Sequence, residues 1–271
     1  MKENKINTHI YYIYYIYMAS INHKLDVIYF HIPKTAGTYI QKMLQDYYNF
    51  TSYNFLIRSD FHIFNKFNNQ QYNCLNDYIN VSPFSNRLYG VNNYYSGSKE
   101  LIDMTTLNEE RWNKAFKFTF VRNPYTRFIS GWNFILSSPT ISKNLIDNDT
   151  YEKFENLEYF INNRNELSDK AYNHIFLSQY DQIINNNSIN DMNFIGKQEN
   201  LKEDLKIILN KIGFSELIHD KNININKNKL DYNYYKTYYT QFIFDFVNEH
   251  FDKDFLEFNY EKYNNYEEFM K

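Results

Sequence analysis

Two kinds of apolar pattern follow one another along this chain. Residues 25–32 (LDVIYFHI) and 116–121 (FKFTFV) are nearly continuous apolar and aromatic runs of strand length. Such runs are typical of strands that are buried on both faces of a parallel sheet. In residues 38–48 the apolar positions instead recur at spacings of three and four, at Ile40, Met43, Leu44 and Tyr47. This period predicts a helix with one buried face directly after the first strand.

The same alternation continues to the end of the chain. The second strand leads into a helix that Asn123 caps and Pro124 begins, because proline is favoured at the first helical position. Two helices are predicted within 151–183, a strand at 192–196, a helix that ends at Gly213, and helical periodicity over 233–258. Strands that alternate with helices predict a three-layer α/β fold with a central parallel sheet flanked by helices.

The chain is predicted to form a single α/β domain over residues 25–271, preceded by a variable N-terminal segment, 1–24, that need not be ordered. The apolar stretch in that segment, residues 9–19, is shorter than the roughly 20 residues that a membrane-spanning helix needs. We therefore expect no transmembrane span. Met18 is an alternative start, which would make the tyrosine repeats before it dispensable.

Net charge and cysteine content limit the classes of ligand and partner that the chain can bind. The net charge of −3 argues against a broad basic surface for nucleic acid, so an anion site would have to be built from a few residues. The single cysteine, Cys74, excludes an intrachain disulfide and has no metal-ligand spacing around it. We expect a reducing compartment, the cytoplasm, and no metal site. The oligomeric state stays open.

The corner between the first strand and its helix carries residue types that suit an anion. A helix that begins straight after a buried parallel strand presents free N–H groups at the carboxyl edge of the sheet. Gly37 lets the backbone approach a ligand closely, and Thr35 and Thr38 add hydroxyl groups. Lys34 adds a positive charge, but it precedes the glycine, an order that disfavours a metal-dependent nucleotide hydrolase of the Walker type. The alternative is an ordinary turn with a surface lysine.

A second corner follows the strand at 116–121. Arg122 ends that strand, and Ser130 lies two helical turns further on. Arginine recognises phosphate through a forked pair of N–H groups, and a serine hydroxyl can complete such a site. Two such corners on one sheet predict a ligand with two separated anionic groups. The alternative is that Arg122 and Arg127 only form surface ion pairs with carboxylates.

Together the two corner motifs resemble those of a known enzyme family. FHIPKTAGT (30–38) and FTFVRNPYTRFISGW (118–132) are similar to the cofactor motifs of the carbohydrate-type sulfotransferases, sulfotransferase family 2. That family uses 3′-phosphoadenosine 5′-phosphosulfate (PAPS) as sulfate donor. The likeness covers roughly residues 25–260 and is weak between 50 and 110. It implies a P-loop-like fold and an enzyme that transfers a sulfuryl group to a hydroxyl.

The resemblance also implies roles for particular residues. It assigns the 5′-phosphosulfate end of PAPS to a loop made of Lys34, Thr35, Ala36, Gly37 and Thr38. It assigns the 3′-phosphate to Arg122 and Ser130. Lys34 would also stabilise the leaving phosphate, with no metal ion. The expected acceptor is a hydroxyl of a carbohydrate, with its pocket in residues 50–110 and 137–190.

The general base is where this chain departs from the family. Several relatives carry a histidine in the region that corresponds to residues 87–101, where this chain has none. We take His62 as the candidate base. The other candidates are His31, His174, Glu100 and Glu109. Among these, His31 precedes the loop within its strand, so it is expected to orient the turn.

Several further residues have simpler interpretations. Glu199 and Asn200 are expected to cap the helix that follows them, and Trp132 to pack in the core rather than on adenine. Lys227 and Lys229 either fold over a nucleotide or form a solvated run of charge.

Two other functions stay open. One is a catalytically impaired protein that binds PAPS, or its product 3′,5′-ADP, without turnover. The other is a small-molecule P-loop kinase, which would need magnesium and a Walker-type aspartate after an apolar strand. The loop order does not support the kinase.

Overall fold

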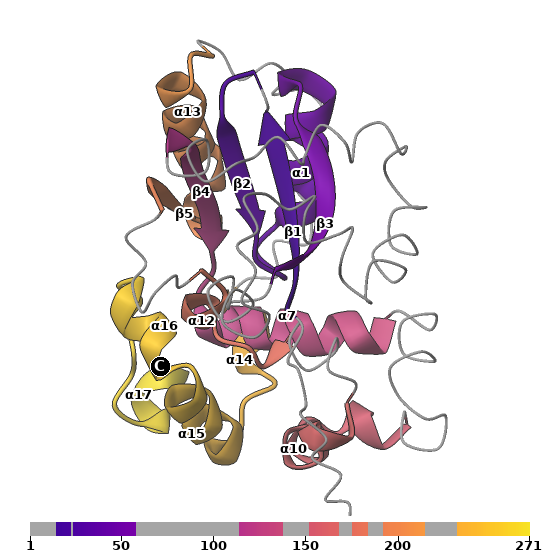
Figure 1. Ribbon diagram of the computed structural model, residues 1–271. Coiled ribbons are helices and arrows are strands. Elements are labelled where there is room, and N and C mark those ends of the chain that lie inside the picture. The colour runs from indigo at the N-terminus through magenta and orange to yellow at the C-terminus, as the bar shows by residue number, and fades with distance from the viewer. Residues whose placement is uncertain are drawn as a thin grey trace, which may run out of the picture.

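The computed structural model describes residues 15–22, 24–57, 114–137, 152–167, 175–183, 192–214 and 232–271. These residues form a twisted sheet with helices packed against it, and a second group of helices at the carboxyl ends of the parallel strands (Figure 1).

The sheet has five strands in the order β3-β1-β2-β4-β5. Their bounds are β1 Tyr15–Asn22, β2 Val27–His31, β3 Thr51–Ile57, β4 Phe116–Val121 and β5 Phe194–Lys197. Strands β2, β4 and β5 are parallel neighbours, whereas β1 runs antiparallel to both β2 and β3. The predicted strands at 25–32, 116–121 and 192–196 are therefore all present, and they form the parallel half of the sheet.

The N-terminal boundary that we predicted needs correction. Strand β1 lies within the segment 1–24 that the sequence assigned to a variable N-terminus, yet it pairs with two strands. Met18 of β1 lies opposite His31, and Asn22 lies opposite Val27. The sheet therefore begins at residue 15, ahead of the predicted domain start at 25. Strand β3 was also not predicted, since it falls where the sequence pattern is least regular.

One face of the sheet packs against two helices, α1 (Gly37–Tyr48) and α13 (Leu201–Lys211). Tyr29 of β2 and Phe118 of β4 are fully buried between them. The helix side of this core consists of apolar residues at helical spacing: Ile40, Met43, Leu44, Leu201, Leu205, Ile208 and Leu209. The buried face that the sequence predicted for the first helix is confirmed at Ile40, Met43 and Leu44. It is wrong at Tyr47, which is 41% exposed, and the next residue, Tyr48, is buried instead.

A second core forms below the strands around α7 (Pro124–Ser137), which lies beneath the carboxyl ends of β2 and β4 in Figure 1. The helices that pack with it are α10 (Leu157–Asn162), α14 (Tyr232–Lys236), α15 (Gln241–His250), α16 (Asp252–Glu257) and α17 (Tyr266–Met270). Trp132 is part of this core, and its Nε1 donates a hydrogen bond of 2.8 Å to the Phe154 carbonyl oxygen. The prediction that Trp132 is a core residue is confirmed.

Short elements complete the described chain. They are α12 (Gln179–Ile183) and the 3-10 turns Glu152–Glu155, Arg164–Glu166 and Gln198–Asn200. The predicted helix signals at Asn123 and Gly213 hold: the Asn123 side chain accepts from the Tyr125 N–H at 3.0 Å, and Gly213 has φ 92° just after α13. The cap predicted at Asn200 is wrong, because its side chain makes no capping hydrogen bond to α13.

Glu199 also does something other than capping α13. One of its carboxylate oxygens accepts from the Asn123 N–H at 2.8 Å, and the other accepts from the Tyr260 hydroxyl at 2.9 Å. Glu199 therefore links the start of α7 to the chain after α16. With these corrections, the P-loop-like α/β fold with a central, mainly parallel sheet flanked by helices is confirmed.

Candidate active site

The first corner is a tight loop between β2 and α1. Lys34 (φ 70°) and Ala36 (φ 68°) both adopt left-handed backbone conformations, whereas Thr35 and Gly37 do not have positive φ. Left-handed residues that alternate with ordinary ones turn successive N–H groups toward the same side, which makes a concave site for an anion. Ala36 caps α1 without a side-chain hydrogen bond, so the first N–H groups of the helix are not used by a capping side chain.

Threonine 35 and threonine 38 differ in what they can contribute. Thr35 is fully buried, and its hydroxyl donates a 2.8 Å hydrogen bond to the Ile32 carbonyl oxygen. Its side chain therefore holds the loop in shape, and only its backbone N–H is left for a ligand. Thr38, in the first turn of α1, is exposed and keeps its hydroxyl at the surface.

Gly37 is required by a contact that the sequence did not show. A Cβ at this position would lie 1.8 Å from Cδ2 and 1.9 Å from Nε2 of His31. The His31 ring lies in the core with 5% of its surface exposed, and burial lowers its pKa to about 4, opposed by a contact with Gln41. A buried, neutral imidazole under the loop fits the predicted role of orienting the turn.

Arg122 of the second corner is surrounded by oxygen atoms from three elements. Its Nε donates to the Thr126 hydroxyl at 2.9 Å, and its Nη2 donates to the Tyr235 hydroxyl at 2.7 Å. Its Nη1 donates to the Lys34 carbonyl oxygen at 3.3 Å. A guanidinium has five N–H donors, so two remain that no described residue accepts. These two are available for an anionic ligand.

The two corners are joined by their arginines. Arg127 is 2% exposed, and its Nε donates to the Pro33 carbonyl oxygen at 3.2 Å while Nη2 donates to the Leu177 carbonyl oxygen at 3.1 Å. Burial lowers its pKa to about 10, opposed by the charge of Asp254. The alternative that these arginines are surface ion-pair partners is therefore wrong for Arg127. Arg122 and Arg127 bind adjacent carbonyl groups of the first loop, which fixes one corner against the other.

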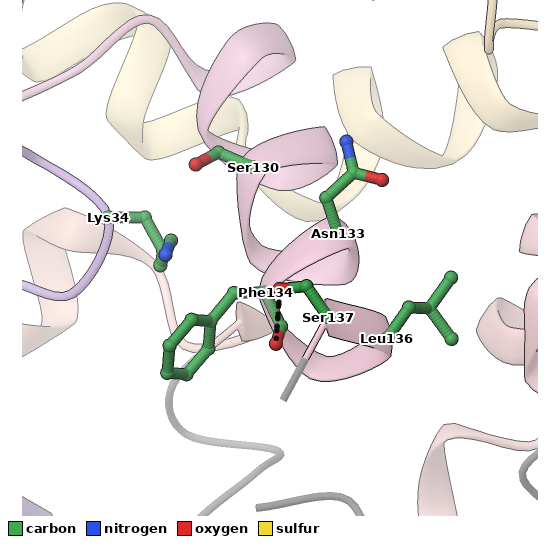
Figure 2. Close-up of a pocket in the computed structure, with 6 residues that line it drawn as sticks. All are labelled: Lys34, Ser130, Asn133, Phe134, Leu136 and Ser137. Carbon is green, nitrogen blue, oxygen red and sulfur yellow. Dashed lines mark hydrogen bonds between the residues drawn. The ribbon is translucent and has the colours of Figure 1, made fainter. Parts of the chain in front are cut away.

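A pocket of about 480 Å³ lies where the first loop meets α7. It is lined by Lys34, Ser130, Asn133, Phe134, Leu136 and Ser137. Figure 2 shows Lys34 reaching from its loop toward the side of α7 that carries Ser130 and Phe134. The Lys34 Nζ lies 4.0 Å from the centre of the Phe134 ring, a cation–π contact. Burial, together with the charges of Arg122 and Arg127, lowers the pKa of Lys34 to about 8.

The structure therefore brings Lys34 and Ser130 to one pocket, although they lie on different elements and far apart in the sequence. Arg122 is tied to the same loop through the Lys34 carbonyl group. Of the other predicted residues of the loop, Thr35 and Ala36 form the turn, and Gly37 and Thr38 begin α1.

Comparison with known sequences decides the family. The sulfotransferase family model matches residues 17–261 of the chain. The chain belongs to the sulfotransferase family. The assignment to family 2 that the two motifs indicated is confirmed, and this sulfotransferase is a transferase of sulfuryl groups that acts on a hydroxyl-bearing acceptor. No curated protein and no solved structure gives a match.

Several predictions fall on residues that the structure of this sulfotransferase does not describe. They concern His62 as general base, the alternatives His174, Glu100 and Glu109, the loop lysines Lys227 and Lys229, and most of the predicted acceptor pocket. Among the described residues, no three His, Cys, Asp or Glu side chains form a group that could hold a metal ion. None of the described helices has the length and apolar character needed to cross a bilayer.

The structure also adds residues to the sulfotransferase site that sequence reasoning missed. Asn133, Phe134 and Ser137 line the pocket on α7, one and two helical turns beyond Ser130. Helical spacing of three, four and seven from Ser130 could have indicated them. Tyr235 carried no such signal, since its contact with Arg122 joins residues that are far apart in the sequence.

Proposed function

We propose that this sulfotransferase transfers the sulfuryl group of PAPS to a hydroxyl of a carbohydrate by in-line displacement. The observation that carries the proposal is that Lys34 and Ser130 lie in the wall of one pocket, while Arg122 is hydrogen-bonded to the Lys34 carbonyl oxygen. PAPS has anionic groups at both its 5′ and 3′ ends. A site with two separated sets of donors suits such a ligand better than one with a single anion.

The donors present fit the two ends of PAPS. The loop N–H groups and the Lys34 ammonium suit the 5′-phosphosulfate. The two remaining N–H donors of Arg122 and the Ser130 hydroxyl suit the 3′-phosphate. The contact between Arg122 and the Lys34 carbonyl group keeps these two sets in a fixed relation.

In this mechanism PAPS supplies the sulfuryl group, whose bond to the phosphate oxygen breaks as a bond to the acceptor oxygen forms. Lys34 stabilises the negative charge that develops on the departing phosphate oxygen. A pKa of about 8 leaves about nine tenths of Lys34 protonated at neutral pH, so the ammonium is available for this role. The acceptor proton requires a base, for which His62 is our proposal.

The carbohydrate acceptor and the cytoplasmic location are further parts of the proposal. The acceptor class rests on the resemblance of the two motifs to the carbohydrate-type enzymes. The polar groups of Asn133 and Ser137 beside the Phe134 ring are compatible with a sugar, because sugars present hydroxyls at their edges and C–H groups on their faces. The location rests on the single cysteine.

Calorimetric titration with 3′,5′-ADP, the product nucleotide, tests the proposal. AMP, which lacks the 3′-phosphate, is the ligand control, and Lys34→Ala and Arg122→Ala are the variants. We expect 3′,5′-ADP to bind more tightly than AMP, and Arg122→Ala to remove that difference. Lys34→Ala should lower turnover by orders of magnitude with a smaller loss of product affinity, because Lys34 acts most strongly in the transition state. Absence of binding to either nucleotide would refute the proposal.

A further inference from the structure

The main chain of Arg122 is held by a side chain from a distant part of the sequence. The Arg122 N–H donates to Gln179 Oε1 at 2.8 Å, and Gln179 Nε2 donates to the Arg122 carbonyl oxygen at 2.8 Å. One amide group therefore satisfies both polar groups of a single residue. Gln179 is fully buried at the start of α12, so water does not compete for these two hydrogen bonds.

The Gln179 side chain is itself held in one orientation. Asp254 Oδ2 accepts from the backbone N–H of Gln179 at 2.9 Å and from its Nε2 at 3.3 Å. Asp254 Oδ1 accepts from the Tyr180 N–H at 2.8 Å. Turning the amide over would place its NH2 against the Arg122 N–H and its oxygen against two acceptors. Asp254 therefore fixes which end of the amide faces each group of Arg122.

The Asp254 carboxylate that anchors this arrangement is buried, and nearby groups compensate its negative charge. Asp254 on α16 is fully buried, and burial raises its pKa, while the charge of Arg127 and three hydrogen bonds from Gln179 and Tyr180 act in the opposite direction. The chain of contacts runs from α16 through Asp254 and Gln179 to Arg122. Asp254 and Gln179 are fully buried, and Arg122 is half-buried.

This arrangement matters because the position of the Arg122 guanidinium depends on the position of the Arg122 backbone. Arg122 follows β4 directly and precedes the cap of α7, so it is not held by a strand or helix ladder of its own. Its guanidinium is positioned by Thr126, Tyr235 and Lys34, which are fixed to separate elements. A shift of the Arg122 main chain would misplace the two N–H donors that remain for a ligand.

We propose that Gln179 is a positioning residue for Arg122, and that it sets the preference of the site for a nucleotide with a 3′-phosphate. The inference rests on the proposed function, in which Arg122 holds that phosphate. Gln179 does not contact the ligand. It acts by fixing the backbone from which the arginine reaches, and Asp254 acts one step behind it.

The test compares Gln179→Met with Gln182→Met in the full chain. Gln182 is a matched control, since it is a buried glutamine on the same helix. Among the described residues its Nε2 donates to the nearby Leu177 carbonyl oxygen, at 3.1 Å, and not to Arg122. The readout is the ratio of the calorimetric Kd for AMP to the Kd for 3′,5′-ADP. Thermal unfolding of each variant is measured alongside. Because loss of stability alone weakens both nucleotides equally, the ratio reports positioning.

We expect Gln179→Met to lower the ratio about tenfold, the size of one charge-assisted hydrogen bond, while Gln182→Met leaves it within about twofold. An unchanged ratio in Gln179→Met, with the wild-type protein still preferring 3′,5′-ADP, would overturn this inference and leave the proposed function standing. A wild-type protein without that preference would overturn both. If Gln179→Met does not fold, Gln179→Asn decides, because the shorter amide cannot reach both groups and must also lower the ratio.

Discussion

The contact between Gly37 and His31 gives a prediction whose size follows from the structure. Replacing Gly37 with alanine would put a methyl carbon 1.8 Å from His31 Cδ2, whereas carbon atoms in ordinary contact lie about 3.5–4.0 Å apart. The ring or the loop would have to move by roughly 1.7 Å or more. His31 has little room, since it lies over Tyr29 with ring centres 6.4 Å apart and is almost fully buried. We expect Gly37→Ala to lower the free energy of unfolding by about 3 kcal/mol.

Urea denaturation of four proteins separates this clash from other effects of alanine. They are the wild type, Gly37→Ala, His31→Ala and the double variant. Removing the His31 ring opens a cavity but makes room for the new methyl group. The double variant should therefore be about 2 kcal/mol more stable than the sum of the single effects predicts. Gly131→Ala in α7 is a control glycine, since its Cβ would lie 3.1 Å from Ile175 Cγ1, a clash that small movements relieve.

Additive effects would refute the reasoning. If the two single changes sum to the double variant within about 0.5 kcal/mol, His31 is not what restricts position 37. Gly37 would then be needed for another reason, such as close approach of the ligand. In that case Gly37→Ala would weaken binding of 3′,5′-ADP while leaving the unfolding free energy close to that of the wild type.

Two further predictions concern pH. His31 has a pKa of about 4 in the folded protein and an ordinary value of 6.5, so the unfolded chain binds more protons between these values and stability must fall as pH is lowered from 6.5 to 4. The free energy of unfolding, measured by urea denaturation, should fall by about 3 kcal/mol over this range in the wild type and not in His31→Ala. Parallel plots of unfolding free energy against pH for the two proteins would contradict this prediction. Lys34, with a pKa of about 8, should lose its charge as pH rises through 8, so calorimetry should show weaker binding of 3′,5′-ADP above that pH. Lys34→Arg should make the affinity for 3′,5′-ADP independent of pH in this range. An affinity of the wild type that does not change with pH would rule out a contact between the charged lysine and the nucleotide.

The parts of the fold that the sequence predicts are those with local signals. Strand β4 is a nearly continuous apolar and aromatic run, and α7 begins at a cap and a proline that lie next to each other. Strand β1 has no comparable signal, because its tyrosine repeats look like a bias of composition. What makes residues 15–22 a strand is pairing with β2 and β3, which no local pattern encodes. The domain boundary was misplaced for this reason.

The residues of the site also divide into those with a local sequence signal and those without one. Lys34 and Ser130 lie in motifs whose residue types suit an anion, and the structure brings them to one pocket. Gln179 could not be found this way, since its partners are the backbone groups of Arg122, and every residue has such groups. The role predicted for Glu199 was wrong for the same reason. Its neighbour in the sequence is α13, but its hydrogen bonds go to Asn123 and Tyr260, which are far away in the sequence.

The second core has a consequence for how the protein is made. Tyr235 and Asp254, which hold Arg122 and Gln179, lie within residues 232–271, and Phe269 of the same segment is buried against Tyr125. During synthesis the β2 and β4 corners leave the ribosome long before these residues do. A nascent chain can therefore form its parallel strands early, but the arginine that we assign to the 3′-phosphate acquires the support of Tyr235 only after 113 more residues have been added. A chain that stops before residue 232 would retain both sequence motifs and lack the side chains that align them.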